Sequence, residues 1–355
     1  MLFDSEDKKP AWQFNYLRRN SVTKSTVLYL SRKDVECVNL PMTEIIDALS
    51  SMFREKGEGR VEMPPKPGIH TRKDAFIHAM PAYIPSMKAA GMKWVSGYPE
   101  NQKKGLPYIA GLLILNDPET GLPIAVMDAT WITAQRTGAA TALAAKYLAR
   151  AESSSLGILA CGVQGRSNLE ALACLFKITK VKAFDSHPEI AQRFAREMAA
   201  MVHADIEVVM TPKAAVVGLD LVVTSGPILK DPSPMIETDW LAEGAFASAV
   251  DFDSYWQGAA LRQADKLATD DIPQMEYYRS VGYFQSTPRA YADLGEIVAG
   301  LKPGRQDDGE RILAINLGIA LDDMAVAPII LTQFPLALPD YNGSTVPIPS
   351  SRAFR

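Results

Sequence analysis

The chain has 355 residues, of which 47% are hydrophobic, so it can bury a substantial core and exceeds the usual size of one domain. The 37 Lys and Arg residues against 41 Asp and Glu give a formal net charge of -4 without a dense basic run, which argues against nucleic acid or an anionic membrane as the main partner. The 3 cysteines form no CxxC motif or Cys/His cluster, which argues against a disulfide framework and a metal site and indicates the cytosol.

Residues 1–26 are polar and charged, which predicts an extension that precedes the first domain. Residues 1–26 carry charges where a signal peptide needs an apolar segment, and no apolar run further along is long enough to span a bilayer. We therefore expect a flexible N-terminal extension on a cytoplasmic protein.

The first half of the chain predicts a sheet framed by helices. From Val27 a short strand precedes an amphipathic helix over residues 42–55. Short apolar or alternating runs separated by Pro and Gly then continue to residue 128, a pattern typical of an antiparallel sheet. A helix of about 20 residues, TWITAQRTGAATALAAKYLAR, leaves that sheet.

After residue 151 the pattern changes to strands that alternate with helices, which predicts a parallel, doubly wound sheet. A helix (ADLGEIVAGL), a strand (RILAINLG) and a helix (IALDDMAVAPIILTQ) then return the chain to the first domain, and the Pro- and Ser-rich tail is expected to be extended or loosely docked. The predicted domains are 27–150 plus 319–355, with 151–318 inserted between them.

A glycine-containing turn joins the first strand of the parallel sheet to a helix expected to begin at about Arg166. The places of the three glycines of a GxGxxG fingerprint are taken by Ala160, Gly162 and Gly165. We expect Ala160 to replace a glycine with a negative φ. The backbone N–H groups of Gly162, Val163 and Gln164 are then predicted to hold a pyrophosphate.

The next strand ends in Asp185, where a carboxylate meets the adenosine ribose in such folds. No arginine stands beside Asp185 to receive a 2′-phosphate, which favours NAD and leaves NADP possible. The alternative is structural: the turn simply joins a strand to a helix, and Asp185 caps the helix that begins near HPEI.

Three lone cations stand in the glycine- and proline-punctuated first half: Lys66, Lys93 and Arg136. A buried cation with apolar neighbours needs an anion, and a substrate carboxylate is one candidate. The alternative is that these cations face water or pair with structural acids. His78 alternates within a strand, where it is either a site residue or a hydrogen-bonded core residue.

A late strand of the parallel sheet ends in two acids, Asp251 and Asp253. Ligands of such sheets bind beyond the carboxyl ends of the strands, so one of these acids is a candidate proton donor and acceptor in amine oxidation. The other is expected to cap the following turn, and spacing alone does not choose between them.

A family resemblance rests on long segments that follow one another in the same order along the chain. They include VEMPPKPG, HAMPAY, GMKWVSGYPENQKKGLPYIAGLLILNDPETGLPIAVMDATWITAQRTGAATALAAKYLAR, GEIVAGLKPGR and LGIALDDMAVA. From about residue 28 to 333 the chain resembles the ornithine cyclodeaminase and mu-crystallin family, and within it most closely the archaeal type of alanine dehydrogenase. The resemblance implies an α/β protein in which a Rossmann NAD-binding domain is inserted into a split α+β substrate-binding and dimerisation domain. It also implies a homodimer.

By this resemblance, Lys66, Lys93 and Arg136 bind the substrate carboxylate, His78 contacts the substrate and Asp253, rather than Asp251, is the catalytic acid/base. The predicted catalytic residues are Asp253, Lys66 and Lys93. The predicted cofactor-binding residues are Arg136, Thr137, Gly162, Val163, Gln164, Asp185, Ser186, Thr224, Ser225, Asn316 and Gly318.

Several positions depart from the family pattern. His78 stands where ornithine cyclodeaminases commonly have Glu and the archaeal alanine dehydrogenase has Arg. After the catalytic Asp, where relatives continue with Gly, Pro, Gly and Lys, this chain has SYWQ, which includes Tyr255 and Trp256. Asn316 replaces the serine of the DSVG or DSTG motif near the nicotinamide. Tyr255 and Trp256 either narrow the pocket or pack in the interior.

The resulting hypothesis is an NAD-dependent oxidoreductase that acts on the C–N bond of a small 2-amino acid, or reduces the corresponding imine. Loss of the glutamate favours this over the alternative, an ornithine cyclodeaminase that releases L-proline and ammonia. A second alternative is a non-catalytic, nucleotide-dependent binding protein of the mu-crystallin type.

Overall fold

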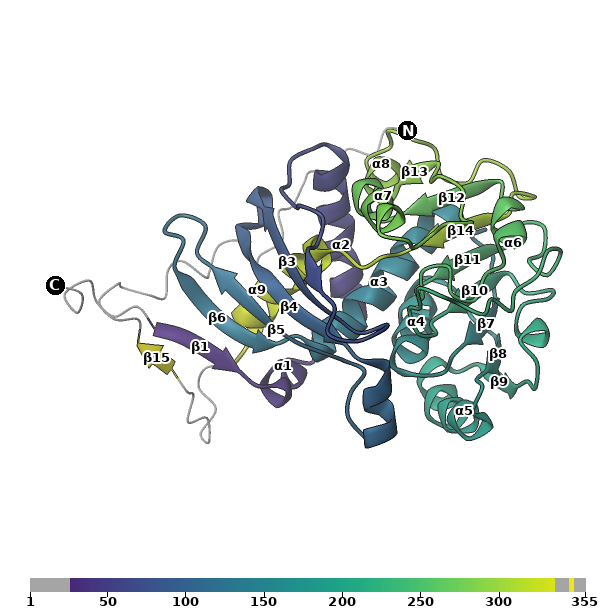
Figure 1. Cartoon of the computed structure of the whole chain (residues 1–355), viewed down its shortest axis with the longest axis horizontal. Helices are drawn as coiled ribbons and strands as arrows, with labels where there is room; N and C mark the ends of the chain where they lie inside the picture. Colours follow the sequence, from purple (N-terminus) through teal and green to yellow (C-terminus); the bar gives the residue numbers. More distant parts are fainter. Residues whose placement is uncertain (1–25, 336–344, 348–355) are drawn as a thin grey trace, which may run out of the picture.

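The computed structural model describes residues 26–335 and 345–347, which form two sheets with helices between and around them (Figure 1). The predicted N-terminal extension and most of the tail lie outside the described residues. Within the described residues, no helix combines the length and apolar character that a bilayer span requires.

The first sheet has 7 strands in the order β15-β1-β6-β5-β4-β3-β2. Its strands are β1 (Thr26–Leu30), β2 (Gly68–Ile69), β3 (Phe76–Ile84), β4 (Ala89–Gly97), β5 (Ile109–Asn116), β6 (Pro123–Asp128) and β15 (Thr345–Pro347). The strands β2 to β6 pair antiparallel as predicted, but β1 pairs parallel to β6, so the sheet is mixed rather than antiparallel. A crossover connection permits this pairing, because α1 (Arg32–Cys37) and α2 (Met42–Gly57) follow β1.

Alternation along β3 and β4 decides which side chains enter the interior. In β3 the buried positions are His78, Met80, Ala82 and Ile84, and in β4 Lys93 and Val95 are buried beside them. His78 pairs with Val95 and Met80 with Lys93, so these side chains share one face of the sheet. The helix α9 (Ala320–Gln333) packs on this face.

The helix α3 (Thr130–Leu148) lies between the two sheets in Figure 1, and small residues let it pack closely. It crosses α4 (Val163–Leu175) at Gly138, where a Cβ atom would lie 2.3 Å from the carbonyl oxygen of Ser167. Most of α3 is buried, as expected of a helix with packed elements on both sides.

The second sheet has 8 strands, all parallel, in the order β13-β12-β14-β11-β10-β7-β8-β9. Its strands are β7 (Ser155–Leu159), β8 (Lys180–Phe184), β9 (Asp205–Val208), β10 (Leu221–Thr224), β11 (Phe246–Ala249), β12 (Lys266–Thr269), β13 (Ala292–Asp293) and β14 (Ile312–Ile315). The helices α4, α5 (Pro188–Val202), α6 (Gly258–Arg262), α7 (Ile272–Ser280) and α8 (Leu294–Val298) connect them, together with a short helical turn at Lys213–Ala215. This confirms the doubly wound parallel sheet. Two further helical turns, Pro85–Met87 and Pro99–Lys104, connect strands of the first sheet.

The sequence analysis missed β12 and β13, which are short and lack an alternating or long apolar pattern. The strand β14 joins the middle of the second sheet, so the chain returns to the first sheet only with α9. The domain limits at residues 150 and 319 remain predictions.

The close crossing of α3 and α4 predicts that a methyl group added at Gly138 destabilises the protein. Gly138→Ala forces the two backbones apart and is expected to lower the free energy of unfolding by about 1–3 kcal/mol, measured by urea denaturation. Gly162→Ala is the control, because Gly162 has a φ of −75° and open space where its Cβ would lie. An unchanged urea midpoint for Gly138→Ala would contradict the packing described for this crossing.

Candidate active site

The turn after β7 leads directly into α4, which begins at Val163 and not near Arg166 as predicted. No side chain caps this helix, so its first N–H groups point into the space beyond the sheet. A Cβ on Gly162 would meet nothing within 4 Å, whereas a Cβ on Gly165 would lie 2.6 Å from the carbonyl oxygen of Ala160. Gly162 thus leaves room for a ligand, and Gly165 lets the helix pack on the strand.

Ala160 corrects one expectation, because its φ is +74° rather than negative. Its N–H donates to the Phe184 carbonyl (2.9 Å), and its own carbonyl accepts the Ser225 hydroxyl (2.9 Å), so the surrounding strands hold it in this conformation. A left-handed conformation at a residue other than glycine is strained. The turn therefore needs a glycine-like backbone even though this chain places alanine there.

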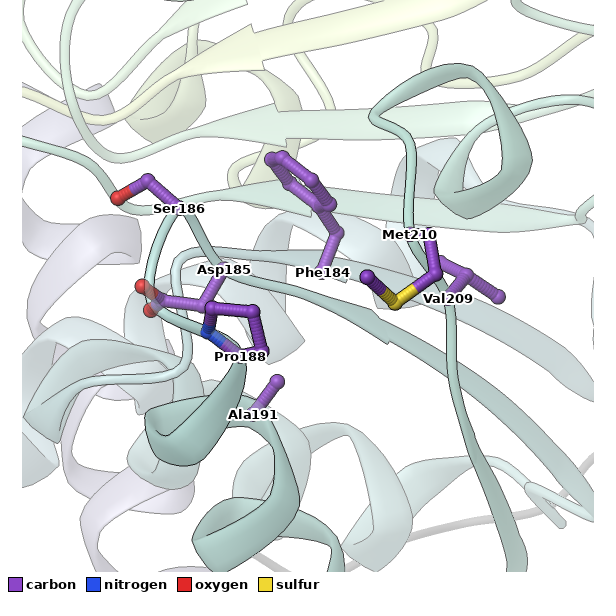
Figure 2. A pocket seen from close by; sticks show the side chains of 7 residues that line it. All are labelled: Phe184, Asp185, Ser186, Pro188, Ala191, Val209 and Met210. Atoms are coloured by element: carbon purple, nitrogen blue, oxygen red, sulfur yellow. The ribbon is translucent and has the colours of Figure 1, made fainter.

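Asp185 does not cap α5, whose N-cap residue is His187 and which has no side-chain cap, and it lies at a cavity. Its carboxylate accepts the backbone N–H groups of Cys161 (2.8 Å) and His187 (2.9 Å). Beside it is a cavity of about 240 Å³ beyond the ends of β8 and β9. The lining residues are Phe184, Asp185, Ser186, Pro188, Ala191, Val209 and Met210, with Asp185, Ser186 and Pro188 on one side and Val209 and Met210 on the other (Figure 2).

These features fit a dinucleotide. A free helix N-terminus accepts a pyrophosphate, an acid at the end of β8 accepts ribose hydroxyls, and an apolar cavity accepts an adenine ring. The cavity contains no Lys or Arg for a 2′-phosphate, which is consistent with NAD.

Other predicted cofactor residues use their side chains within the protein. The Thr224 hydroxyl donates to Asp251 (2.6 Å) and accepts the Trp256 indole N–H (3.0 Å), so Trp256 has the packing role. The Thr137 hydroxyl donates to a backbone carbonyl of its own helix (2.7 Å). The Asn316 amide contacts Thr141 (3.4 Å) and Ser248 (3.3 Å). These three side chains make hydrogen bonds within the protein, and their contact with a cofactor remains a prediction.

Lys66, Lys93 and Arg136 converge from a loop, from β4 and from α3, and we call them the cation cluster. All three are buried. Lys93 Nζ lies 2.6 Å from Asp323 Oδ2, Arg136 Nη1 donates to Asp322 Oδ2 (3.2 Å), and Arg136 Nε lies 3.3 Å from Asp323 Oδ1. Structural acids on α9 therefore oppose two of these cations, which was the alternative open at the sequence level.

Lys66 is held differently. Its Nζ donates to the carbonyl oxygens of Leu317 and Gly318 (2.9 Å each), and the Asp270 carboxylate accepts the Gly318 N–H (2.7 Å). Gly318 has a φ of +73°, and a Cβ there would lie 2.6 Å from Arg136 Nη1, so the position requires glycine.

Burial dominates the acid–base properties of the cluster. It lowers the pKa of Lys66 to about 7 and that of Lys93 to about 8. It raises the pKa of Asp270 to about 6 and that of Asp322 to about 7. Desolvation disfavours every charged form, and the opposite charges nearby offset part of this cost.

The sequence analysis missed the three acids Asp270, Asp322 and Asp323. A signal was present in LGIALDDMAVA, because two adjacent acids in an otherwise apolar helix need buried partners. Asp270 gave no comparable signal, since β12 before it was not recognised.

His78 is buried beside the cluster and is neutral. Burial, followed by the charge of Lys66, lowers the pKa of His78 to about 3. Its ring stacks on Phe76 at 4.3 Å and lies 6.3 Å from the Tyr278 ring, which in turn lies 5.4 Å from Lys66 Nζ. The wall of the site here is aromatic and uncharged.

The two acids after β11 have different surroundings. Asp251 is buried, accepts the Thr224 hydroxyl and the Gly226 N–H (3.3 Å), and has its pKa raised by burial to about 7. Asp253 is half-buried and accepts the Thr287 hydroxyl (2.7 Å), and burial raises its pKa as well. Within the described residues Asp253 makes no hydrogen bond or ion pair with the cation cluster. Aromatic rings lie between Asp253 and the cation cluster: Phe252, the neighbour of Asp253, packs on Tyr278 at 5.1 Å, and the Tyr278 ring lies 5.4 Å from Lys66 Nζ.

The fold and the dinucleotide site define the class of NAD(P)-dependent dehydrogenases and reductases. The chain belongs to the ornithine cyclodeaminase/mu-crystallin family, whose model matches residues 26–334. It is 36% identical to an alanine dehydrogenase of Archaeoglobus fulgidus over 315 residues, which covers 85% of this chain and 94% of that protein.

Two solved structures extend the comparison. An archaeal alanine dehydrogenase dimer with bound NAD matches with a TM-score of 0.79 and 35% identity, covering 90% of this chain and 99% of that one. The Δ1-pyrroline-2-carboxylate reductase of Thermococcus litoralis, in complex with NADH and L-proline, matches with a TM-score of 0.79 and 32% identity, covering 86% and 97%. These likenesses confirm the predicted family and NAD binding.

The strained turn gives a prediction about stability. Ala160→Gly is expected to raise the free energy of unfolding by about 0.5–1 kcal/mol, because glycine adopts the positive φ without the Cβ clash although it gains freedom in the unfolded chain. Urea denaturation measures the change. Ala149→Gly, at a residue with a φ of −90°, is the control and is expected to lower stability. A loss of stability in Ala160→Gly would refute strain at this turn.

Proposed function

We propose that the protein is an NAD-dependent oxidoreductase that acts on the C–N bond of a small 2-amino acid, or in reverse reduces the corresponding imine. The observation that carries this proposal is the convergence of three buried cations in a chain that also has the features of a dinucleotide site. The names of its relatives support it, since they include an alanine dehydrogenase and a Δ1-pyrroline-2-carboxylate reductase.

The cation cluster is suited to a substrate carboxylate. Within the described residues the Arg136 side chain makes one hydrogen bond, to Asp322, and its Nε forms an ion pair with Asp323 Oδ1 at 3.3 Å without a hydrogen bond. A guanidinium carries five N–H donors arranged to match a carboxylate. Arg136 therefore retains donors for the substrate, while Lys66 and Lys93 add positive charge on the same face.

Asp253 is the proposed acid and base. When bound, NAD supplies the hydride acceptor at its nicotinamide. The chain must then handle protons: the amine loses one as the imine forms, and the water that attacks the imine carbon loses another before ammonia leaves. Asp253 is placed for this role because its carboxyl is only half-buried and its pKa is raised, whereas Asp251 is enclosed. A proton is also returned by Asp253 when an imine is reduced.

The substrate side chain is proposed to be small and uncharged. A second ammonium needs a carboxylate partner, and the neutral His78 and Tyr278 at this wall provide none. This favours dehydrogenation or imine reduction over cyclisation of a diamino acid.

We also propose a homodimer in the cytosol. Trp94 on β4 and Leu112 on β5 are directly paired on the outer face of the first sheet, where they are 44% and 40% exposed. Neighbouring exposed apolar side chains of this kind mark interaction surfaces. One similar structure is a dimer, and all three cysteines are free, as expected in a reducing compartment.

Absorbance at 340 nm tests the reaction. Purified protein is assayed with NAD and L-alanine, L-ornithine, L-lysine or L-arginine, and with NADH and pyruvate plus ammonia or cyclic imines. Net NADH formation or consumption is expected, and Asp253→Asn is expected to lower kcat by at least about 100-fold while NADH still binds. Asp205→Asn, at an exposed acid on β9, is the matched control.

Three outcomes would contradict the proposal. Ammonia release from ornithine without net NADH identifies a cyclodeaminase, which recycles its cofactor. NADH binding without any turnover identifies a binding protein. Full activity of Asp253→Asn removes Asp253 from the mechanism.

His78→Glu tests the side-chain preference. A carboxylate at this wall attracts a second substrate ammonium, so kcat/KM for L-ornithine relative to L-alanine is expected to rise by about tenfold. His78→Gln, which is polar but uncharged, controls for loss of the ring. No gain in the Glu variant, in a protein that unfolds at the wild-type temperature, would show that His78 does not exclude diamines.

A further inference from the structure

The segment after α7 is held over the end of β11 by one arginine. Arg279, near the end of α7, donates through Nη1 to the carbonyl oxygens of Phe284 and Thr287 (2.8 Å for Thr287), and through Nη2 to that of Pro288 (3.1 Å). Three carbonyls bound by one guanidinium fix the course of residues 284–288. This segment belongs to none of the motifs that the sequence analysis singled out.

The side chain that this segment presents to the site is Thr287. It is buried, and its hydroxyl donates to Asp253 Oδ2 at 2.7 Å. Asp253 Oδ1 accepts no hydrogen bond from another residue in the described part of the chain. The Thr287 hydroxyl thus anchors one carboxylate oxygen, and within the described residues no other residue donates to the second.

We propose that Thr287 is a positioning residue for Asp253, that its hydroxyl orients the carboxylate, and that Arg279 keeps Thr287 in place. This inference rests on the proposed role of Asp253 in proton transfer. It assigns to the α7–β13 connection a part in the chemistry, although the connection contributes no group that touches the reacting atoms.

The contrast with Asp251 separates this arrangement from ordinary loop packing. Asp251 is fully buried and receives both a hydroxyl and a backbone N–H, which satisfy its two oxygens. Asp253 receives one hydroxyl from another residue, besides a hydrogen bond from its own backbone N–H, and lies at a half-buried position. An acid that exchanges protons with a substrate needs such an incomplete set of partners.

The charges around Asp253 set the sign of the expected effect. Burial raises its pKa, whereas the Thr287 hydrogen bond, the hydrogen bond from its own backbone N–H and the charge of Arg279 lower it. Asp251 lies on the same strand end, and Glu276 pairs with Arg279 at 3.4 Å. Removing the hydroxyl therefore raises the pKa of Asp253, and a reaction that needs the ionised carboxylate loses rate on the acid side.

The test compares Thr287→Val, which keeps the shape and removes the hydroxyl, with Thr287→Ser, which keeps the hydroxyl. The pH dependence of kcat is measured with NAD and the best amino acid substrate from the 340 nm panel. The acid limb is expected to move up by about 0.5–1 pH unit in the Val variant, with KM little changed, and to stay near wild type in the Ser variant. Thr179→Val, at an exposed threonine before β8, is the matched control.

Packing alone predicts the reverse order, with Ser more harmful than Val and neither shifting the pH profile, and that result overturns the proposal. Thr287→Ala replaces the Val variant if the latter does not fold. An Asp253→Asn enzyme that keeps its activity, or the absence of turnover for every substrate, overturns the proposed function itself. A shifted Val profile together with an inactive Asp253→Asn enzyme supports both.

Discussion

The structure depends on the cost of burying charge. The cation cluster lies in the interior with Asp270, Asp322 and Asp323, and all six residues are buried, the most exposed being Lys66 at 7%. A single buried charge without a partner is strongly destabilising, so the acids and cations are stable only together. This requirement ties the loop before β2, the strand β4, the helix α3, the end of β12 and the helix α9 to one another. The ion pairs that form the candidate site are therefore also the contacts that hold these elements together.

The same network leaves the site prepared for an anion. The acids on α9 approach Lys93 and Arg136 from one side, and Lys66 is held by two carbonyl dipoles rather than by a full negative charge. Positive potential therefore remains on the open side of the cluster, where carbonyls and partial pairing do not cancel it. Burial lowers the pKa of Lys66 and that of Lys93, so the charge of the site can also change when either lysine gains or loses a proton.

Sequence patterns predicted the parts of the molecule that depend on local periodicity or on extended family motifs. The sequence predicted the long helix α3, the antiparallel hairpins and the alternation of strands and helices. It also pointed to the three cations, because burying a charge in apolar surroundings costs free energy unless a partner is present. The partners of those cations were not found, because pairing Lys66 with the Leu317–Gly318 loop depends on tertiary structure across 251 residues. The left-handed backbone at Ala160 was missed for the opposite reason: local preference predicted a relaxed residue, and strand contacts overrode it.

The loop between β14 and α9 has a consequence for the order of assembly. Its two carbonyls complete the shell of a lysine that is synthesised some 250 residues earlier, and α9 delivers the last acids to the first sheet. During synthesis the first sheet emerges with its buried cations still lacking counter-charges, and the parallel sheet grows beside it before they arrive. The buried cations of the first half of the chain therefore acquire their full set of partners only after α9 has been synthesised.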